Sequence, residues 1–234
     1  TGANRAAYTT VMCRTEPDAP DHAAFSMIIV PTDTPGYTIV RETPVLGIRG
    51  GHCEVAYDDV RVPADHLLGE RGRGFVIAQE RLGPGRIFHA MRWLGQAQRA
   101  FDLLCERLVS REAFGSSLAS KQLMQQHVFD SYAQIQACRL LTLHAAEAVD
   151  RGGDARIEIG AVKVVGAKML HDVIDRAVQA YGAAGLTDDT PLSHMYRTAR
   201  FARIYDGPDE VHIQSVARRL LKTYRDGGTQ SFSG

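Results

Sequence analysis

Three carboxylates surround a Gly-Pro pair near the carboxyl end of the sequence, in the run Asp206-Gly207-Pro208-Asp209-Glu210. Carboxylates can act as general bases. Proline suits the first helical position, so the run predicts a helix that starts at Pro208. The positive end of the helix dipole favours the charged form of Asp206, whereas burial would favour its protonated form. The alternative is that Asp206 only caps the helix, and that the next two carboxylates complement the helix dipole.

The sequence lacks complete motifs for several other kinds of catalytic or binding site. None of the ten glutamates has a histidine three positions on, which argues against a di-iron site in a helical bundle. Gly72-Arg73-Gly74 lacks the third glycine and the preceding strand of a dinucleotide-binding loop, and no Walker A motif is present. The run 115–119 lacks the closing glycine of a nucleophile elbow. The nine histidines are scattered singly, so we predict no metal site.

The elements that must position these residues differ between the two parts of the chain. Up to residue 69, short runs rich in β-branched and aromatic residues alternate with turn residues, at 7–14, 26–30, 37–40 and 52–62. Six of the nine prolines precede residue 70, as expected where loops and strand ends are frequent. We predict an antiparallel β region of about five strands.

After residue 69 the apolar residues recur at helical spacing, which predicts three long helices. The predicted buried faces are Ile87, Met91, Leu94, Phe101, Leu104 and Leu108 in the first, Met124, Val128, Ile135, Thr142 and Val149 in the second, and Val162, Val165, Met169, Val173 and Ala180 in the third. A shorter helical segment over 193–204 precedes the helix from Pro208. Long helices joined by short loops indicate a bundle. The predicted fold class is α+β, an antiparallel β region followed by an all-α up-down four-helix bundle.

The composition is that of a globular protein, with 44% hydrophobic residues, 23% charged residues and a formal net charge of zero. A neutral chain without a block of Lys and Arg offers no electrostatic footprint for nucleic acid. Its apolar runs are far shorter than the roughly 20 residues that span a bilayer. Four cysteines without C-x-x-C spacing favour a reducing compartment, so we expect the cytoplasm of a bacterium or the mitochondrial matrix of a eukaryote.

Three segments of the helical part, read in order, resemble the acyl-CoA dehydrogenase family. They are Arg-Glu-Ala-Phe-Gly at 111–115 with Gln122 after it, Gln-Ala-Tyr-Gly-Ala-Ala-Gly at 179–185, and Ile-Tyr-Asp-Gly-Pro-Asp-Glu-Val-His at 204–212. The runs at 14–18, 30–36 and 58–63 look like the second part of that family's middle β-domain. The resemblance implies two domains, 1–69 as the second part of the middle β-domain and 70–234 as the C-terminal helical bundle domain. It also implies that this piece is roughly the last three-fifths of a longer enzyme.

The run from Asp206 to His212 is similar to that of the subgroup acting on long-chain or branched acyl-CoAs. The family reaction is α,β-dehydrogenation of a fatty acyl-CoA, in which a carboxylate takes the α-proton and FAD accepts the β-hydrogen as hydride. Asp206 matches the position of this base. Aspartate is one methylene shorter than the glutamate usual there, roughly 1.3 Å less reach, so helix or substrate must lie closer.

The resemblance also implies binding residues. Those that match FAD contacts are Arg111, Phe114, Gln122, Gln179, Tyr181, Gly182, Pro208 and Glu210, and Arg111 would reach the FAD pyrophosphate across a dimer interface. Ala183 stands where a second glycine is usual. Arg86 and Gly207 match substrate-side positions, with Arg86 near the CoA end. The alternative interpretations are surface arginines at 86 and 111 and a glycine-rich helix stop at 182.

The implied partners are an acyl-CoA substrate, an electron-transferring flavoprotein as electron acceptor and further copies of the chain in a homodimer or homotetramer. The implied process is fatty acid β-oxidation. Two alternatives stay open at this point. One is a flavin oxidase on the same fold, and the other is a non-catalytic truncated or partner subunit.

Overall fold

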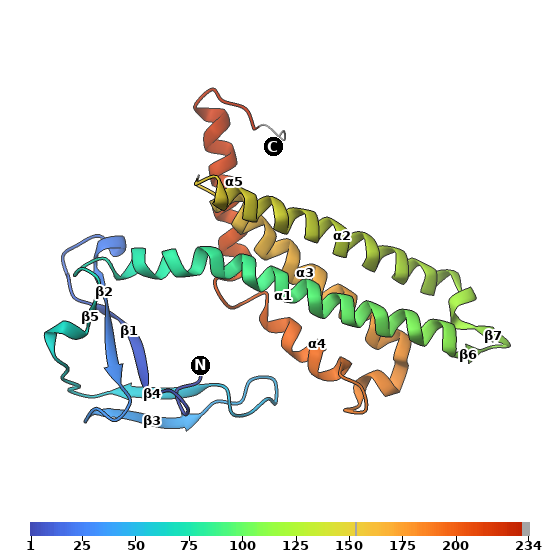
Figure 1. Cartoon of the computed structure of the whole chain (residues 1–234), viewed down its shortest axis with the longest axis horizontal. Helices are drawn as coiled ribbons and strands as arrows, with labels where there is room; N and C mark the ends of the chain where they lie inside the picture. The colour runs from blue at the N-terminus through green and yellow to red at the C-terminus, as the bar shows by residue number, and fades with distance from the viewer. Residues whose placement is uncertain (153, 231–234) are drawn as a thin grey trace. The chain divides into compact units, whose positions relative to one another are not determined.

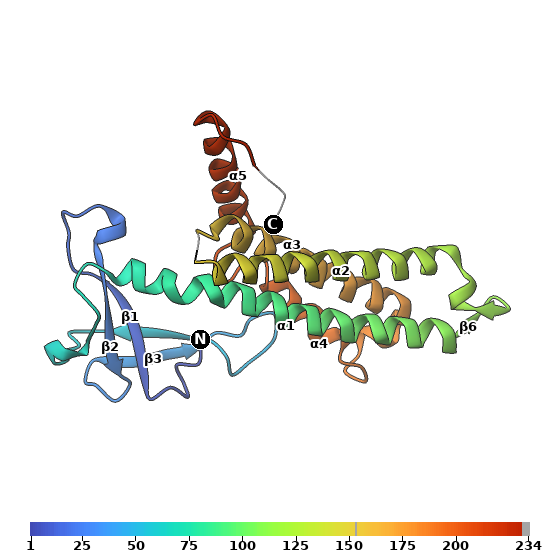
Figure 2. The same ribbon diagram turned by 45° about the horizontal axis from the view of Figure 1, so that its top comes forward.

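The computed structural model describes residues 1–152 and 154–230. The chain forms two compact units, Thr1–Arg81 and the part from Leu82 onward (Figure 1). The first unit holds the larger sheets, and the second is almost entirely helical (Figure 2). The boundary between the units lies after Arg81, further along the chain than the change in hydrophobic period that the sequence shows near residue 69.

The first unit contains two small antiparallel sheets. The strands are β1 (Tyr8–Arg14), β2 (Phe25–Pro31), β3 (Tyr37–Glu42), β4 (Cys53–Tyr57) and β5 (Leu67–Leu68), with the short helices η1 (Asp21–Ala23) and η2 (Ala64–His66). One sheet has the order β1-β2-β5, and β3 pairs with β4 in the other. The strand predicted to run to residue 62 ends at Tyr57, because Asp59 has a φ of +49° that breaks the extended backbone.

The second unit is built from long helices. Its elements are α1 (Gly74–Ser110, which begins in the first unit), β6 (Glu112–Ala113), β7 (Ser116–Ser117), η3 (Leu118–Ser120), α2 (Gln122–Asp150), α3 (Arg156–Tyr181), η4 (Gly182–Leu186), α4 (Leu192–Phe201) and α5 (Asp209–Arg225). The last helix begins one residue later than predicted, with Pro208 at its N-cap. The described residues confirm an antiparallel β region followed by a helical domain.

Helix α3 is the centre of the helical unit, since it packs against α2, α4 and α5. Its fully buried side chains include Val162, Leu170 and Ile174, each worth about 1.5–3 kcal/mol relative to exposure. Gly166 lets α1 approach, because a Cβ there would lie 3.1 Å from a ring carbon of Trp93. The core therefore depends on small residues as well as large ones.

Two positions assigned to buried faces are exposed. Met91 is 55% exposed and Val165 is 42% exposed, so these two assignments are wrong. The buried face of α1 consists largely of alanines together with Trp93 and Leu104. Spacing identifies which residues share a helix face, but the neighbouring elements decide which part of that face they cover.

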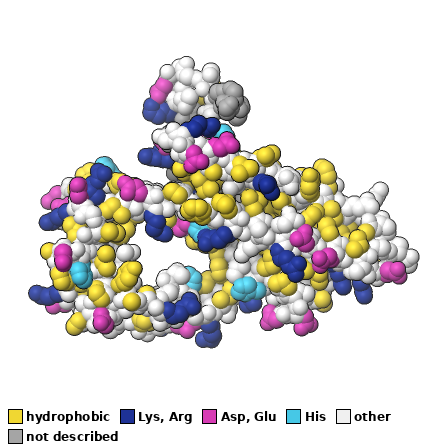
Figure 3. All heavy atoms as spheres, viewed as in Figure 1, with side chains coloured by type: hydrophobic (Ala, Val, Ile, Leu, Met, Phe, Trp, Pro, Cys, Tyr) yellow, Lys and Arg dark blue, Asp and Glu magenta, His cyan; other side chains and the backbone are white. Residues whose placement is uncertain are grey.

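Hydrophobic side chains also lie at the surface of the helical unit, among polar ones (Figure 3). On α2, Phe129 is 65% exposed and Leu140 is 67% exposed. None of the helices in the described ranges has both the length and the apolar character needed to cross a membrane.

Candidate active site

Asp206 lies in the short loop between α4 and α5, and its backbone is in the left-handed region. Its φ is +54° and that of Gly207 is +99°. Two successive residues with positive φ reverse the chain abruptly, and such a conformation is rare for a residue with a side chain. Backbone strain of this kind persists only where surrounding contacts hold it.

Two side chains from different helices hold the backbone carbonyl of Asp206. Arg86 on α1 donates from Nε to this oxygen at 2.9 Å, and His212 on α5 has its Nε2 atom 3.1 Å away. Because a carbonyl only accepts hydrogen bonds, the Nε2 atom of His212 carries the proton. The strained loop is therefore tied to α1 and to α5 at one atom.

The carboxylate of Asp206 is held separately. Its Oδ2 atom lies 2.8 Å from Nε2 of His89, and both side chains are 22% exposed. The ring of His89 packs against Tyr205, with ring centroids 4.7 Å apart, and stacks on Trp93 at 5.7 Å. Trp93 donates from Nε1 to the hydroxyl of Tyr205 at 2.9 Å. Asp206 therefore does not act as a helix cap, which removes that alternative.

Burial favours the neutral form of both histidines. It lowers the pKa of His89, and the positive charge of Arg92 lowers it further. Burial also lowers the pKa of His212, against the hydrogen bond to the Asp206 carbonyl, which raises it. At neutral pH, two uncharged imidazoles thus contact Asp206.

The start of α5 is anchored by a buried ion pair. Asp209 accepts from Nε of Arg203 at 2.7 Å, and its other oxygen lies 3.6 Å from Nζ of Lys163 on α3. Lys163 is fully buried and Asp209 is 2% exposed. Burial lowers the pKa of Lys163, against the attraction of Asp209. This pair fixes the helix that follows Asp206 against the centre of the bundle.

Gly207 is the one position in this loop where the structure requires glycine. A Cβ at Gly207 would lie 2.7 Å from Nε2 of His212, in addition to the strain of its positive φ. We expect Gly207→Ala to reduce the free energy of unfolding by about 2 kcal/mol or more, measured by urea denaturation.

Gly227→Ala is the matched control for this substitution. Gly227 has a φ of +81° with open space around its Cβ position, so only the backbone penalty of about 1 kcal/mol applies. Equal losses in the two variants would show that the contact with His212 does not constrain the loop.

The comparison with known proteins covers both units. Residues 72–221 match the family described as acyl-CoA dehydrogenase, C-terminal domain, and residues 1–60 match acyl-CoA dehydrogenase, middle domain. The chain belongs to the acyl-CoA dehydrogenase family. The resemblance found in the sequence is therefore confirmed.

Individual relatives agree with this membership. The protein named probable acyl-CoA dehydrogenase FadE2 of Mycobacterium tuberculosis is 53% identical over 215 residues, which are 90% of this chain and 53% of the relative. A solved Mycobacterium abscessus protein described as an acyl-CoA dehydrogenase gives a TM-score of 0.91 at 42% identity, over 95% of this chain and 56% of the other. A chain of a solved electron transferring flavoprotein of Acidaminococcus fermentans gives 0.85 at 30% identity, over 94% of this chain and 58% of the other. The chain spans about half the length of these relatives.

In this acyl-CoA dehydrogenase chain the predicted site residues fall into two groups. Arg86, Gly207, Pro208 and Glu210 lie around Asp206, with Pro208 and Glu210 exposed in the first turn region of α5. Arg111, Phe114 and Gln122 lie beyond the far end of α1, and the helical rise from Arg86 to that end is about 36 Å. The structure does not bring these two groups into one pocket of a single chain.

The loop between α1 and α2 presents its predicted binding residues to solvent. Phe114 is 99% exposed with a φ of +53°, and Arg111 and Gln122 are exposed. At the end of α3, Gln179 and Gly182 are exposed, and Tyr181 packs under the guanidinium of Arg107 at 5.2 Å. The Arg107–Tyr181 contact places the two predicted loops at the same end of the helical unit.

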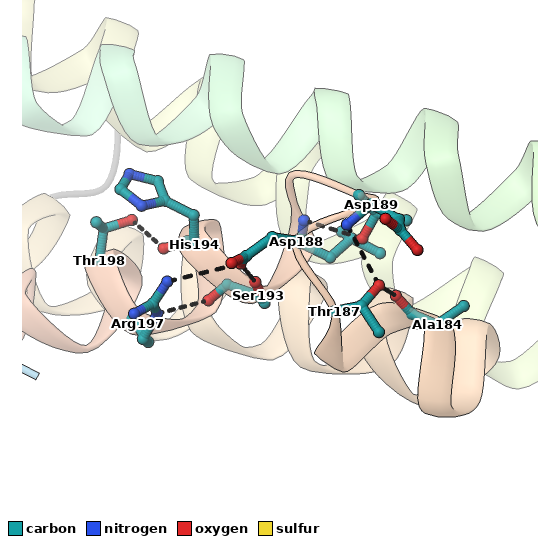
Figure 4. Close-up of polar contacts among 10 residues, drawn as sticks. Ala184, Thr187, Asp188, Asp189, Ser193, His194, Arg197 and Thr198 are labelled. Atoms are coloured by element: carbon teal, nitrogen blue, oxygen red, sulfur yellow. Dashed lines mark hydrogen bonds and ion pairs between the residues drawn. The ribbon is translucent and has the colours of Figure 1, made fainter. Parts of the chain in front are cut away.

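Local hydrogen bonds order the segment after Gly182 (Figure 4). Thr187 donates to the carbonyl of Ala184 at 2.9 Å, Ser193 donates to the carboxylate of Asp188 at 3.0 Å, and Arg197 lies 4.0 Å from that carboxylate. Beside this segment is a cavity of about 580 Å³, lined in part by Gln179, Gly185 and Tyr196. This acyl-CoA dehydrogenase loop thus has a defined conformation next to an open volume.

The sequence predicted no role in the site for His89, His212 or Lys163. His212 lies in the motif that carries Asp206, and His89 lies three residues after Arg86, on the same helix face. These spacings were the available signals. Neither spacing shows that the side chains meet at Asp206, because that meeting depends on how α1, α3 and α5 pack.

No cluster of residues able to hold a metal ion occurs in the parts of the chain that the structure describes.

Proposed function

We propose that this chain is part of an FAD-dependent acyl-CoA dehydrogenase in which Asp206 is the base that removes the α-proton of a fatty acyl-CoA. The observation that carries the proposal is the carboxylate of Asp206, held at one oxygen by His89 while its backbone is fixed by Arg86 and His212. A base must be fixed in position to act efficiently, since a misplacement near 1 Å can cost on the order of a hundredfold in rate.

The residues of the chain supply the acid–base part of this reaction. Asp206 accepts the α-proton on the oxygen that His89 does not contact, and the hydrogen bonds to its carbonyl keep the loop in place during the transfer. Tyr205 and Trp93 border His89 and restrict the access of water to it. FAD, when bound, supplies the acceptor for the β-hydride.

The donor set at the two exposed loops fits FAD. Arg111 offers a guanidinium suited to a pyrophosphate, and Gln122 and Gln179 offer amides. A Cβ at Gly182 would meet nothing within 4 Å, so the backbone there is open to a ligand. We propose that these residues hold FAD together with Phe114, Tyr181, Pro208 and Glu210. The methyl group of Ala183, where a second glycine is usual, limits how closely the backbone approaches.

The separation of the two groups supports an assembly of more than one copy. Arg111 and Gln122 lie a helix length away from Asp206, so we propose that they contact the FAD of a second subunit in a homodimer or homotetramer. The exposed apolar residues of α2 are available for such contacts.

On the substrate side, Gly207 stays a proposed acyl-CoA contact. Arg86 keeps its proposed place near the CoA end, and its Nε atom has the further task of holding Asp206. The run 206–212 supports a long-chain or branched acyl group. An electron-transferring flavoprotein is the proposed acceptor, as the family resemblance implies, and a chain similar to this one occurs in the solved structure described as an electron transferring flavoprotein of Acidaminococcus fermentans. We place the reaction in fatty acid β-oxidation, in the bacterial cytoplasm or the mitochondrial matrix.

The test is to add a panel of acyl-CoAs of different chain length and branching, without oxygen, to the flavin-loaded protein. We expect at least one of them to bleach the visible absorbance of the flavin. If none does, the proposed function is wrong. Oxygen consumption in the absence of a flavoprotein acceptor would instead support an oxidase on this fold. A colourless protein that stays colourless with added FAD would support a non-catalytic subunit.

A further inference from the structure

His89 lies between an anion and a cation of the site. Its Nε2 atom is 2.8 Å from Oδ2 of Asp206, and Nη2 of Arg92 contacts Nδ1 and lies 3.4 Å from Nε2. His89 and Arg92 are three residues apart on α1 and so share one face of that helix. Each ring nitrogen of His89 therefore has a charged partner.

These partners determine where the imidazole carries its proton. A guanidinium has only hydrogen-bond donors, so the Nδ1 atom that faces Arg92 must be an acceptor. The proton of the neutral ring is then on Nε2, which donates to Oδ2 of Asp206. A carboxylate has only hydrogen-bond acceptors and a guanidinium only donors, so one tautomer of the ring satisfies both contacts.

The surrounding charges oppose a second proton on this ring. Burial lowers the pKa of His89, and Arg92 and Lys163 lower it further, whereas Asp206 raises it. Arg86 and His212 are the other basic groups at Asp206, and Tyr205 packs on the ring. His89 is therefore a hydrogen-bond donor throughout the neutral range and not a second base.

We propose that His89 is a positioning residue: with Arg92 beside Nδ1, it donates from Nε2 to Oδ2 of Asp206 and thereby leaves Oδ1 as the oxygen that accepts the proton. This inference rests on the proposed function of Asp206. In the proton transfer the α-C–H bond breaks, an O–H bond forms at Oδ1, and the electron pair stays on the substrate.

The test isolates proton transfer from hydride transfer. An acyl-CoA with sulfur in place of its β-carbon has no β-hydrogen to lose, so in D₂O it reports only the exchange of its α-hydrogens. Deuterium uptake into the recovered analogue is measured by mass spectrometry from pH 5 to pH 9, with the flavin-loaded protein. We expect the original protein to exchange the α-hydrogens of the analogue, and its pH profile is the reference for the variants.

Two substitutions of His89 separate donation from packing. In His89→Gln the amide nitrogen lies near the place of the ring Nε2 atom and can donate to Oδ2 of Asp206, but the amide cannot titrate. We therefore expect an exchange rate within about threefold of that of the original protein. His89→Leu fills space without a donor. Without the donor the carboxylate of Asp206 is no longer held in position, so the maximal exchange rate should be at least tenfold lower.

Arg92→Met tests the control of the tautomer. Without the guanidinium the ring can gain a proton on Nδ1, so a titration that the original profile lacks should appear between pH 5 and pH 8, with slower exchange on its acid side. Arg99→Met, an exposed arginine seven residues further along α1, should leave the profile unchanged.

The outcomes distinguish this inference from the proposed function. Exchange that persists in Asp206→Asn would refute the assignment of the base itself. Exchange that requires Asp206 but is equal in His89→Gln and His89→Leu would show that His89 only packs. An unchanged pH profile in Arg92→Met would refute control of the tautomer by Arg92.

Discussion

The Asp206→Asn variant should still bind FAD, but the rate at which acyl-CoA reduces its flavin should be lower by a factor of about 10²–10⁴. The amide oxygen still accepts the hydrogen bond from His89, but the amide cannot take up the α-proton, and general bases contribute a factor of this size. The loop should keep its shape, because Arg86 and His212 bind the backbone carbonyl rather than the side chain. The measurement is the rate of flavin bleaching by stopped-flow absorbance.

Two further variants make this prediction specific. Asp226→Asn removes an exposed carboxylate at the C-terminal end of α5, outside the proposed catalytic and FAD-binding residues, and should slow bleaching far less. Asp206→Glu keeps the charge but extends the side chain by roughly 1.3 Å, which should cost on the order of a hundredfold because His89 is placed for the shorter residue. Bleaching at the original rate in Asp206→Asn would place the base elsewhere.

The second large effect concerns stability. Asp209→Asn should lower the free energy of unfolding by about 3–5 kcal/mol, because it leaves Lys163 buried without its counter-ion. It also removes the acceptor of the 2.7 Å hydrogen bond from Arg203. The urea midpoint of unfolding, followed by far-ultraviolet circular dichroism, measures the loss.

A double variant shows whether the unpaired charge causes this loss. Lys163→Met combined with Asp209→Asn removes both buried charges, and it should recover a substantial part of the stability, since buried pairs can often be replaced by apolar groups. Glu210→Gln is the exposed control and should change stability by less than about 0.5 kcal/mol. A double variant as unstable as the sum of the two single variants would show that the charges do not interact.

Much of the helical part could be predicted from the sequence because a helix is a local structure. The apolar spacing in α1, α2 and α3 follows from 3.6 residues per turn, and it holds whatever the helices pack against. The predictions for Met91 and Val165 were wrong because the packing of neighbouring elements, and not spacing, decides which part of a helix face is buried. The end of β4 was misjudged because the positive φ at Asp59 is not encoded in the alternation of residue types.

The candidate site was predictable only in part. The sequence identified Asp206 and its flanking Gly-Pro pair, because a motif keeps its residues together along the chain. It assigned Arg86 to the substrate without its bond to the Asp206 carbonyl, which joins residues 120 positions apart. His89 and Lys163 were missed for the same reason, since each meets its partner only through packing of the helices.

The sequence by itself thus determined that this protein has a β region and a helical region, that it resembles one enzyme family, and that Asp206 is the candidate base. Only the tertiary structure decided which oxygen of Asp206 contacts His89, which charged groups face the ring nitrogens of His89, and that Arg111 and Gln122 lie a helix length from Asp206. The physical reason is that spacing along a chain fixes local periodicity, whereas hydrogen bonds and pKa values depend on distances across the packed helices.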